Sequence, residues 1–148
     1  MHPNLSAALH GAAAGTVATL PMSVVMLAAQ AAGLMGKEPP KLVAEKAFEA
    51  VGVRPSETVD NVATSVAHLG FGFVAGALFG LLRHRVELPL PPVAQGIAYG
   101  LLVYTVSYEG WIPALHIMPW PRNDRPGRQP SMVAAHIVFG AVLGALAD

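Results

Sequence analysis

The sequence has 148 residues, of which 53% are hydrophobic and 12% are charged, and its formal net charge at pH 7 is zero. A chain with so few charged residues cannot cover a water-soluble globule with polar surface. The composition therefore indicates a membrane protein whose solvent is the lipid bilayer. The balanced charge provides no basic excess for phosphate groups, which argues against nucleic acid as a partner. The absence of cysteine excludes disulfides and thiolate metal sites. The length predicts one transmembrane domain over residues 1–148.

The first apolar segment covers residues 5–34 and contains no Lys, Arg, Asp or Glu. It exceeds the roughly 20 residues that a membrane helix needs, so we predict a first membrane span, bent at Pro21. In the polar interval that follows, residues 40–51 carry apolar side chains at helical spacing. We predict a short amphipathic helix there that lies on the membrane surface. A connector helix packed on the bundle is an equal alternative.

We predict three further membrane spans, at residues 57–82, 92–112 and 130–147. A tight turn, Arg83 to Pro92, joins the first two of them, and a loop rich in proline and arginine joins the last two. The basic residues are divided unequally between the two sides of the membrane. One side has Lys37, Lys41, Lys46, Arg54, Arg122, Arg125 and Arg128, and the other has Arg83 and Arg85. The positive-inside rule then predicts a multi-pass membrane protein with both termini outside.

A pattern of histidine followed four and eight residues later by glycine occurs twice, at residues 67–78 and 135–146. It makes His68 and His136 equivalent positions, and a weaker match relates the start of the first span to that of the third. We therefore predict an all-α, integral membrane four-helix bundle built from two tandem two-helix repeats. Small residues spaced four apart allow close helix packing in lipid. They are Gly11, Gly15, Gly72, Gly76, Gly80, Gly96, Gly100, Gly140 and Gly144.

Several short motifs follow one another along nearly the whole chain. They are a proline-broken first helix, Glu38-Pro39-Pro40, Ala67-His68-x-x-Phe71-Gly72, Tyr108-Glu109-Gly110-Trp111-Ile112-Pro113-Ala114-Leu115, and Pro126-Gly127-Arg128 before Ala135-His136. This order resembles a family of small uncharacterised bacterial inner-membrane proteins and is more distantly similar to the YagU-like family. The resemblance implies a helical, multi-pass protein of the inner (cytoplasmic) membrane, and it supplies no catalytic residue.

The histidines His68 and His136 are the strongest functional candidates. An imidazole within a membrane span should face the bundle interior, where a hydrogen bond to a neighbouring helix is its commonest role. Bis-histidine ligation of haem b is an alternative, because Arg122, Arg125 and Arg128 could bind the propionates. The glycine faces argue against haem, since they bring helix axes too close for a macrocycle to fit between them.

Other polar and sulfur-containing side chains suggest ion chemistry. Glu109 is the one charged residue of the predicted third span, and it could relay protons or cations together with His116 and the two histidines. An ion pair with an arginine of the following loop is its simpler role. A divalent metal would need Glu109 and His116 as additional ligands. Met22 and Met26 are spaced like a soft-ligand pair for Cu(I), although methionine is also a common apolar filler.

Three functions are compatible with the sequence. The first is an accessory or structural membrane subunit that associates, through its glycine faces, with a membrane protein partner or a second copy. The second is a small transporter-like or cation-relaying bundle, and the third is a haem b protein. We expect no enzyme and no bound cofactor, because the sequence has no hydrolytic motif, no phosphate-binding loop and no HExxH motif.

Overall fold

The computed structural model describes residues 2–86 and 88–147, so Glu87 of the predicted turn lies outside the described residues. The described part is all helical and contains no strand. Three helices are long and apolar enough to cross a membrane, α1 (Pro3–Ala31), α3 (Glu57–Arg85) and α6 (Arg128–Leu146). This finding supports the predicted membrane protein.

The ends of these helices follow from local sequence. α1 begins with Pro3, whose fixed φ suits a first helical residue, and it continues through Pro21. Before α3, the Ser56 hydroxyl accepts a hydrogen bond from the Val59 backbone N–H at 3.4 Å. The first turn of α3 is acidic and its last turn is basic, as the helix dipole favours.

The short helix α2 (Pro39–Ala50) occupies the place of the predicted surface helix. Pro39 and Pro40 start it, and Gly52, with a φ of +70°, follows its end. α2 packs against the first turns of α3, where Lys41 Nζ lies 2.6 Å from Asp60 Oδ2 and 2.6 Å from Asn61 Oδ1. The polar start of α3 is therefore held by α2.

The predicted span at residues 92–112 is not one regular helix. α4 (Pro92–Val106) gives way to the π-helical segment η1 (Ser107–Trp111) and then to one short turn, α5 (Ile112–Ala114). Pro113 explains the change, because it has no N–H for the Glu109 carbonyl and its ring would collide with that carbonyl in a regular helix. Gly110 absorbs the distortion with φ −115° and ψ −105°. The chain then passes through the 3-10 turn η2 (Pro121–Asn123) to α6.

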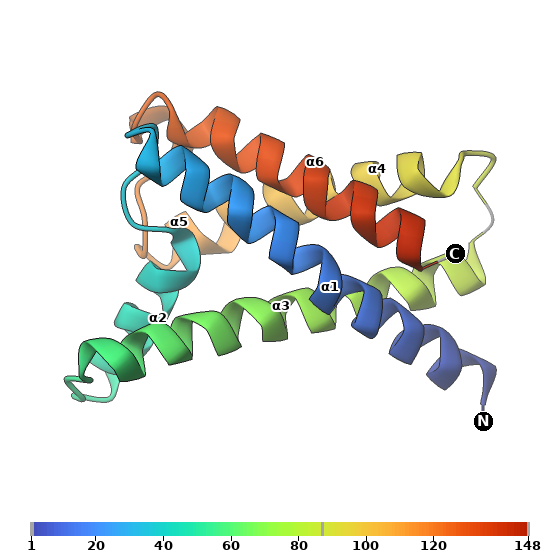
Figure 1. Ribbon diagram of the computed structural model, residues 1–148, viewed down its shortest axis with the longest axis horizontal. Coiled ribbons are helices and arrows are strands. Elements are labelled where there is room, and N and C mark those ends of the chain that lie inside the picture. Colours follow the sequence, from blue (N-terminus) through green and yellow to red (C-terminus); the bar gives the residue numbers. More distant parts are fainter. Residues whose placement is uncertain (1, 87, 148) are drawn as a thin grey trace.

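Helices α1, α3 and α6 run between the same two ends of the molecule, as does α4 together with its continuation through η1 and α5 (Figure 1). Both termini and the α3–α4 turn lie at one end, and α2 and α5 lie at the other. α1 packs against α3 and α6, and α6 also packs against α4. Contacts between α3 and α4 are few, and one of them is a hydrogen bond from the Tyr99 hydroxyl to the Ala75 carbonyl at 2.7 Å. The helices thus form two close pairs, α1/α3 and α4/α6, that meet along α1 and α6.

Each pair is held by glycines in direct backbone contact. A Cβ atom at Gly11 would lie 2.9 Å from the Gly80 Cα, and a Cβ atom at Gly96 would lie 2.7 Å from the Gly144 Cα. All nine predicted packing glycines make contacts of this kind within their own pair. Such approach allows extensive dispersion contact between helices in lipid, where apolar burial provides no driving force for their association.

The contacts in the two pairs correspond, but with a shift of one helical turn relative to the sequence pattern. Gly76 faces the Gly11 carbonyl, as Gly140 faces the Gly96 carbonyl. Extending this correspondence by four residues makes Gly72, and not His68, the counterpart of His136. In the packed structure the contacts of His136 thus match those of Gly72, while the equivalence of the two histidines within a sequence repeat stays a prediction.

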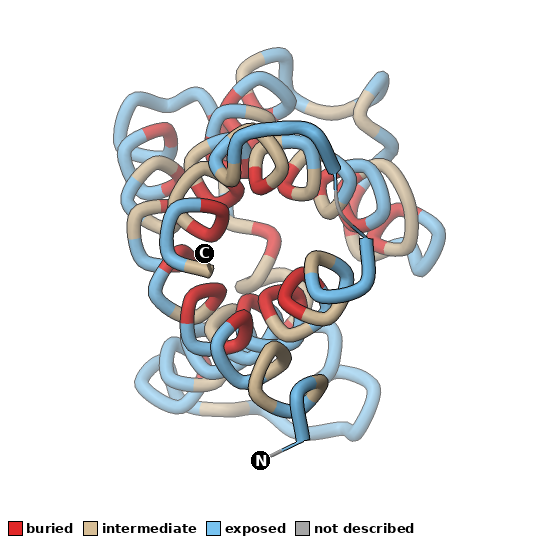
Figure 2. Tube along the Cα trace, turned by 90° about the vertical axis from the view of Figure 1, so that its right-hand side faces the viewer, coloured by how far each residue is buried: buried red, intermediate tan, exposed pale blue. Residues whose placement is uncertain are grey.

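Buried residues lie on the helix faces that point to the middle of the molecule, and exposed residues lie on the outer faces (Figure 2). Many of the buried residues are small, and many of the exposed ones are large and apolar. Ala12, Ala14, Ala18 and Ala135 are buried. Exposed large residues include Leu9, Val17, Leu20, Val24, Leu27, Val66, Phe73, Val74, Leu78, Leu102 and Val106. This distribution suits a lipid environment, where close contact between helices selects small residues and hydrocarbon covers the large ones.

Candidate functional site

A cavity of about 110 Å³ lies where the two helix pairs meet, and both histidines line it. We call it the inner cavity. Its walls are Met22, Met26, Pro39, Pro40, Val43, Ala67, His68, Phe71, Ser107, Trp111, Ile112, Met132 and His136. They come from α1, α2, α3, η1, α5 and α6, so only the tertiary packing assembles this site.

His136 is held in place from within α6. His136 is 3% exposed, and its Nδ1 atom lies 2.7 Å from the Met132 carbonyl oxygen. A carbonyl only accepts hydrogen bonds, so Nδ1 carries the proton and Nε2 has a free lone pair. The Tyr104 ring meets the imidazole edge to face, with 5.5 Å between ring centroids.

His68 is held in place from the neighbouring helix. Its Nδ1 atom lies 3.2 Å from the Ser23 hydroxyl oxygen on α1. That hydroxyl donates its only proton to the Thr19 carbonyl at 2.9 Å, so it accepts from the imidazole. Nδ1 of His68 is therefore protonated too, and Nε2 is left with a lone pair. No hydrogen-bond partner of either Nε2 atom lies among the described residues.

The π-helical segment supplies part of the cavity wall. Ser107 and Trp111, its first and last residues, both line the inner cavity. The Ser107 hydroxyl donates to the Val103 carbonyl at 2.6 Å, which compensates for the altered backbone pattern at this point. Single-turn π segments are frequent at functional sites because they redirect side chains without ending the helix. Here the distortion brings Trp111 to the cavity.

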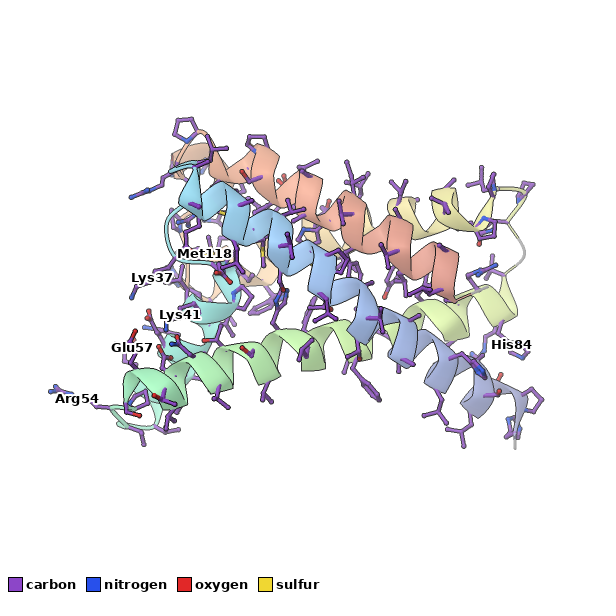
Figure 3. The ribbon with its side chains drawn as sticks, viewed as in Figure 1. Lys37, Lys41, Arg54, Glu57, His84 and Met118 are labelled. Atoms are coloured by element: carbon purple, nitrogen blue, oxygen red, sulfur yellow. The ribbon has the colours of Figure 1, made fainter. Side chains whose placement is uncertain are left out.

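A larger groove of about 560 Å³ descends between α1 and α3 from the α2 end, and we call it the outer groove. Its polar lining includes Ser23, Gln30, Lys37, Glu38, Lys41, Asn61, Thr64, Ser65 and His68. Lys37, Lys41, Arg54 and Glu57 gather at this end of the molecule, and His84 lies at the opposite end (Figure 3). His68 lines both the groove and the inner cavity, so it stands between them.

Two charged residues at the mouth of the outer groove have altered proton affinities. Partial burial raises the pKa of Glu38, and the nearby Lys41 only partly offsets that effect. The hydrogen bond to Asp60 raises the pKa of Lys41 and keeps its ammonium group charged. The mouth therefore combines a firmly cationic lysine with a carboxyl group whose ionised form is disfavoured.

Glu109 lies away from the histidines and pairs with neutral partners. Its Oε1 atom accepts a hydrogen bond from the Tyr104 hydroxyl at 2.9 Å and one from Gln129 at 3.5 Å. Arg122 lines the same surface pocket, but no ion pair between the two occurs in the described part of the chain. The predicted relay is not continuous, because Tyr104 meets His136 through ring contact and not through a hydrogen bond.

The remaining candidates also lie outside the inner cavity. His116 is exposed in the loop after α5, with a φ of +57°. Arg128 is buried and pairs with Asp124 at 3.2 Å, and Asp124 also accepts a hydrogen bond from the Tyr108 hydroxyl at 3.0 Å. Arg125 lies near Gly36. These contacts give Arg128 a structural role at the start of α6.

Haem b does not fit between the histidines. The inner cavity has about 110 Å³, well below the roughly 300–1,000 Å³ of pockets for ligands of drug size. None of the three arginines lines it, so the predicted propionate contacts are not formed. A divalent site with Glu109 and His116 does not form either, because neither residue lines the cavity.

Sequence reasoning missed several residues of the site. Ser23 and Ser107 look like ordinary membrane-helix serines, and only the packing places them at His68 and at the cavity. Met132 could have been found, because it precedes His136 by four residues and so shares a helix face with it. Nothing in the sequence pattern placed Trp111 at the cavity that it lines.

No family model, curated protein or solved structure matches this chain. The resemblance to YagU-like proteins stays a prediction.

Proposed function

We propose that this protein is a cation-binding or cation-conducting membrane protein in which a small cation enters through the outer groove and reaches the inner cavity. The observation that carries the proposal is the position of His68, which lines both spaces. Ionisable groups within membrane spans are costly, and they usually mark substrate or ion pathways. The two free Nε2 lone pairs then provide the binding groups at the end of the pathway.

The proposal includes four membrane crossings by two tandem two-helix units. The similar glycine contacts of the α1/α3 and α4/α6 pairs support this arrangement. The common direction in which the helices cross the molecule also supports it (Figure 1). The continuation of α4 through η1 and α5 supplies the length that α4 lacks for a span. The basic residues at the α2 end favour an inner-membrane protein with that end in the cytoplasm and both termini outside.

Flux into proteoliposomes tests this function. Uptake of protons and of a panel of monovalent and divalent cations should be measured for the wild type, His68→Ala and Glu109→Gln. We expect flux of at least one cation that is lost in His68→Ala and kept in Glu109→Gln, because Glu109 lies outside the pathway. No flux above empty vesicles, or equal flux in the wild type and His68→Ala, would contradict the proposal.

An accessory membrane subunit is the second candidate. α3 buries a smaller share of its residues than α1 or α6, which leaves its outer face free for a partner helix. The glycine faces cannot serve for this purpose, because packing within each pair occupies them. Gly70 on α3 is the exception, since a Cβ atom there would meet nothing within 4 Å. A partner that co-purifies stoichiometrically with the wild type and is lost in Gly70→Leu supports this role.

A further inference from the structure

We propose that the inner cavity is a Cu(I) site, whose ligands are drawn from the thioether sulfurs of Met22, Met26 and Met132 and from Nε2 of His68 and His136. The inference rests on the proposed cation entry through the outer groove, and it names the cation. The five residues come from three helices, α1, α3 and α6, and all of them line the same small space.

Three buried methionines line the inner cavity. Met22 and Met26 lie one turn apart on α1, and Met132 lies one turn before His136 on α6. All three are buried, with exposed fractions of 7%, 0% and 3%, respectively. Thioether sulfur is a soft ligand that selects Cu(I) over the harder divalent metals, and imidazole also suits copper.

The histidines have the tautomer that metal binding requires. Ligating histidines almost always donate the other ring N–H to a fixed acceptor, which orients the ring and raises its basicity. The Met132 carbonyl takes this part for His136, and the Ser23 hydroxyl takes it for His68. Nδ1 of each ring thus has a fixed hydrogen-bond partner, and Nε2 of each ring keeps a lone pair. The protein's own hydrogen bonds account for this arrangement.

The charge of the cavity favours a monovalent ion. No aspartate or glutamate is among its lining residues, so every ligand in it is neutral. The cost of transferring an ion from water into a medium of low dielectric constant rises with the square of its charge. A neutral, soft and mostly apolar cavity therefore accepts Cu(I) far more readily than Zn²⁺ or Mg²⁺.

Replacement of these methionines by leucine should have different effects if they only fill space and if they bind the metal. As apolar filler, methionine can be replaced by leucine at little cost, because the two side chains have similar volumes. As a ligand, it loses the sulfur on the same replacement. Met118 offers a matched control, because it is buried to the same degree, with 5% exposed, and does not line the inner cavity.

Equilibrium binding tests the site. The purified full chain in detergent should be titrated with Cu(I), kept reduced by ascorbate, in competition with a chromogenic Cu(I) chelator. We expect one Cu(I) per chain, a lower affinity in Met22→Leu and Met132→Leu, and unchanged affinity in Met118→Leu. Failure of the wild type to take Cu(I) from the chelator, or equal affinity in the three leucine variants, overturns the assignment.

A second variant tests the geometry without removing a ligand. Ser23→Ala deletes the hydroxyl that accepts the His68 Nδ1 proton, and loss of such a partner typically lowers metal affinity about 10–100-fold. Ser131→Ala is its control, because that hydroxyl bonds the Gly127 carbonyl at 2.7 Å and does not line the cavity. Equal affinity in these two serine variants contradicts the site.

The flux and binding assays separate the two proposals. If His68-dependent flux of another cation occurs and Cu(I) does not bind, the copper assignment fails and the pathway stands. If Cu(I) binds with the expected variant pattern but no flux occurs, the site stands and the transport function fails. Absence of both overturns both proposals.

Discussion

The two helix pairs share one packing device but differ in almost everything around it. In α1/α3, two helices of 29 residues each contact through Gly11, Gly15, Gly72, Gly76 and Gly80. In α4/α6, the helices have 15 and 19 residues, and a π-helical segment extends the shorter one. At 1.5 Å per residue the first pair is about 44 Å long, which exceeds the hydrocarbon core, whereas α4 alone reaches about 22 Å.

The difference shows where a candidate site can arise between two helix pairs that are packed alike. The glycine contacts must be kept in both pairs, since each backbone sits directly against its partner. The residues next to those contacts are free to diverge, and there His136 occupies the position that corresponds to Gly72. His68 lies one turn nearer the α2 end, at the junction of the outer groove and the inner cavity. The site is therefore a feature of asymmetry between the pairs.

The largest effect is expected at the ion pairs that hold the α2 end of the two pairs. Asp124→Asn breaks a buried pair with Arg128, whose side chains are 3% and 8% exposed, and should cost about 3–5 kcal/mol. Asp60→Asn breaks a pair with Lys41 that is more exposed and better screened by solvent, so it should cost clearly less. Unfolding in mixed detergent and SDS micelles measures both. A loss in Asp60→Asn that equals or exceeds the loss in Asp124→Asn would contradict the larger contribution of the buried pair.

Alanine at the central glycines tests whether the two helix contacts are equivalent. Gly76→Ala and Gly140→Ala each place a methyl group against a backbone carbonyl, of Gly11 and Gly96 respectively. Overpacking of this kind typically costs about 1–3 kcal/mol, and we expect similar losses in both pairs. Gly70→Ala is the control, because it faces open space and should stabilise the helix slightly. Clearly unequal losses, measured by the same unfolding assay, would break the proposed correspondence.

The smallest effect concerns the α2 end of the first pair and depends on pH. Burial raises the pKa of Glu38 in the folded chain, so folding favours the neutral form of its carboxyl group. The contribution of this group to stability is fully present below the unfolded pKa, about pH 4. That contribution is lost as the pH rises through the higher folded pKa. Glu38→Gln should therefore raise Tm slightly at pH 7 and leave it unchanged near pH 4.

The control for this variant is Glu49→Gln, because the Glu49 side chain is 70% exposed and forms a surface ion pair with Lys46. It should show no gain at pH 7. A Tm difference between wild type and Glu38→Gln that is the same at both pH values would contradict the role of burial at Glu38.

The sequence by itself determined the membrane class, the positions of the long helices and the glycines that join them. These properties depend on composition and on spacing along one helix, which are local. The break after Val106 was missed, although Pro113 and Gly110 were visible, because apolar composition extends through them. Only the backbone shows how a π-helical segment accommodates a proline four residues after Glu109.

Only the tertiary structure decided the site. Periodicity paired His68 with His136 as copies, but the glycine contacts fix the helix register and offset the two by one turn. The partners on Nδ1, Ser23 for one ring and the Met132 carbonyl for the other, depend on which helices are neighbours. The sequence placed Met22 and Met26 on one helix face, and the crossing of α1 and α6 brought Met132 to them. Contacts between segments far apart in the chain are set by packing, and no spacing along a single helix encodes them.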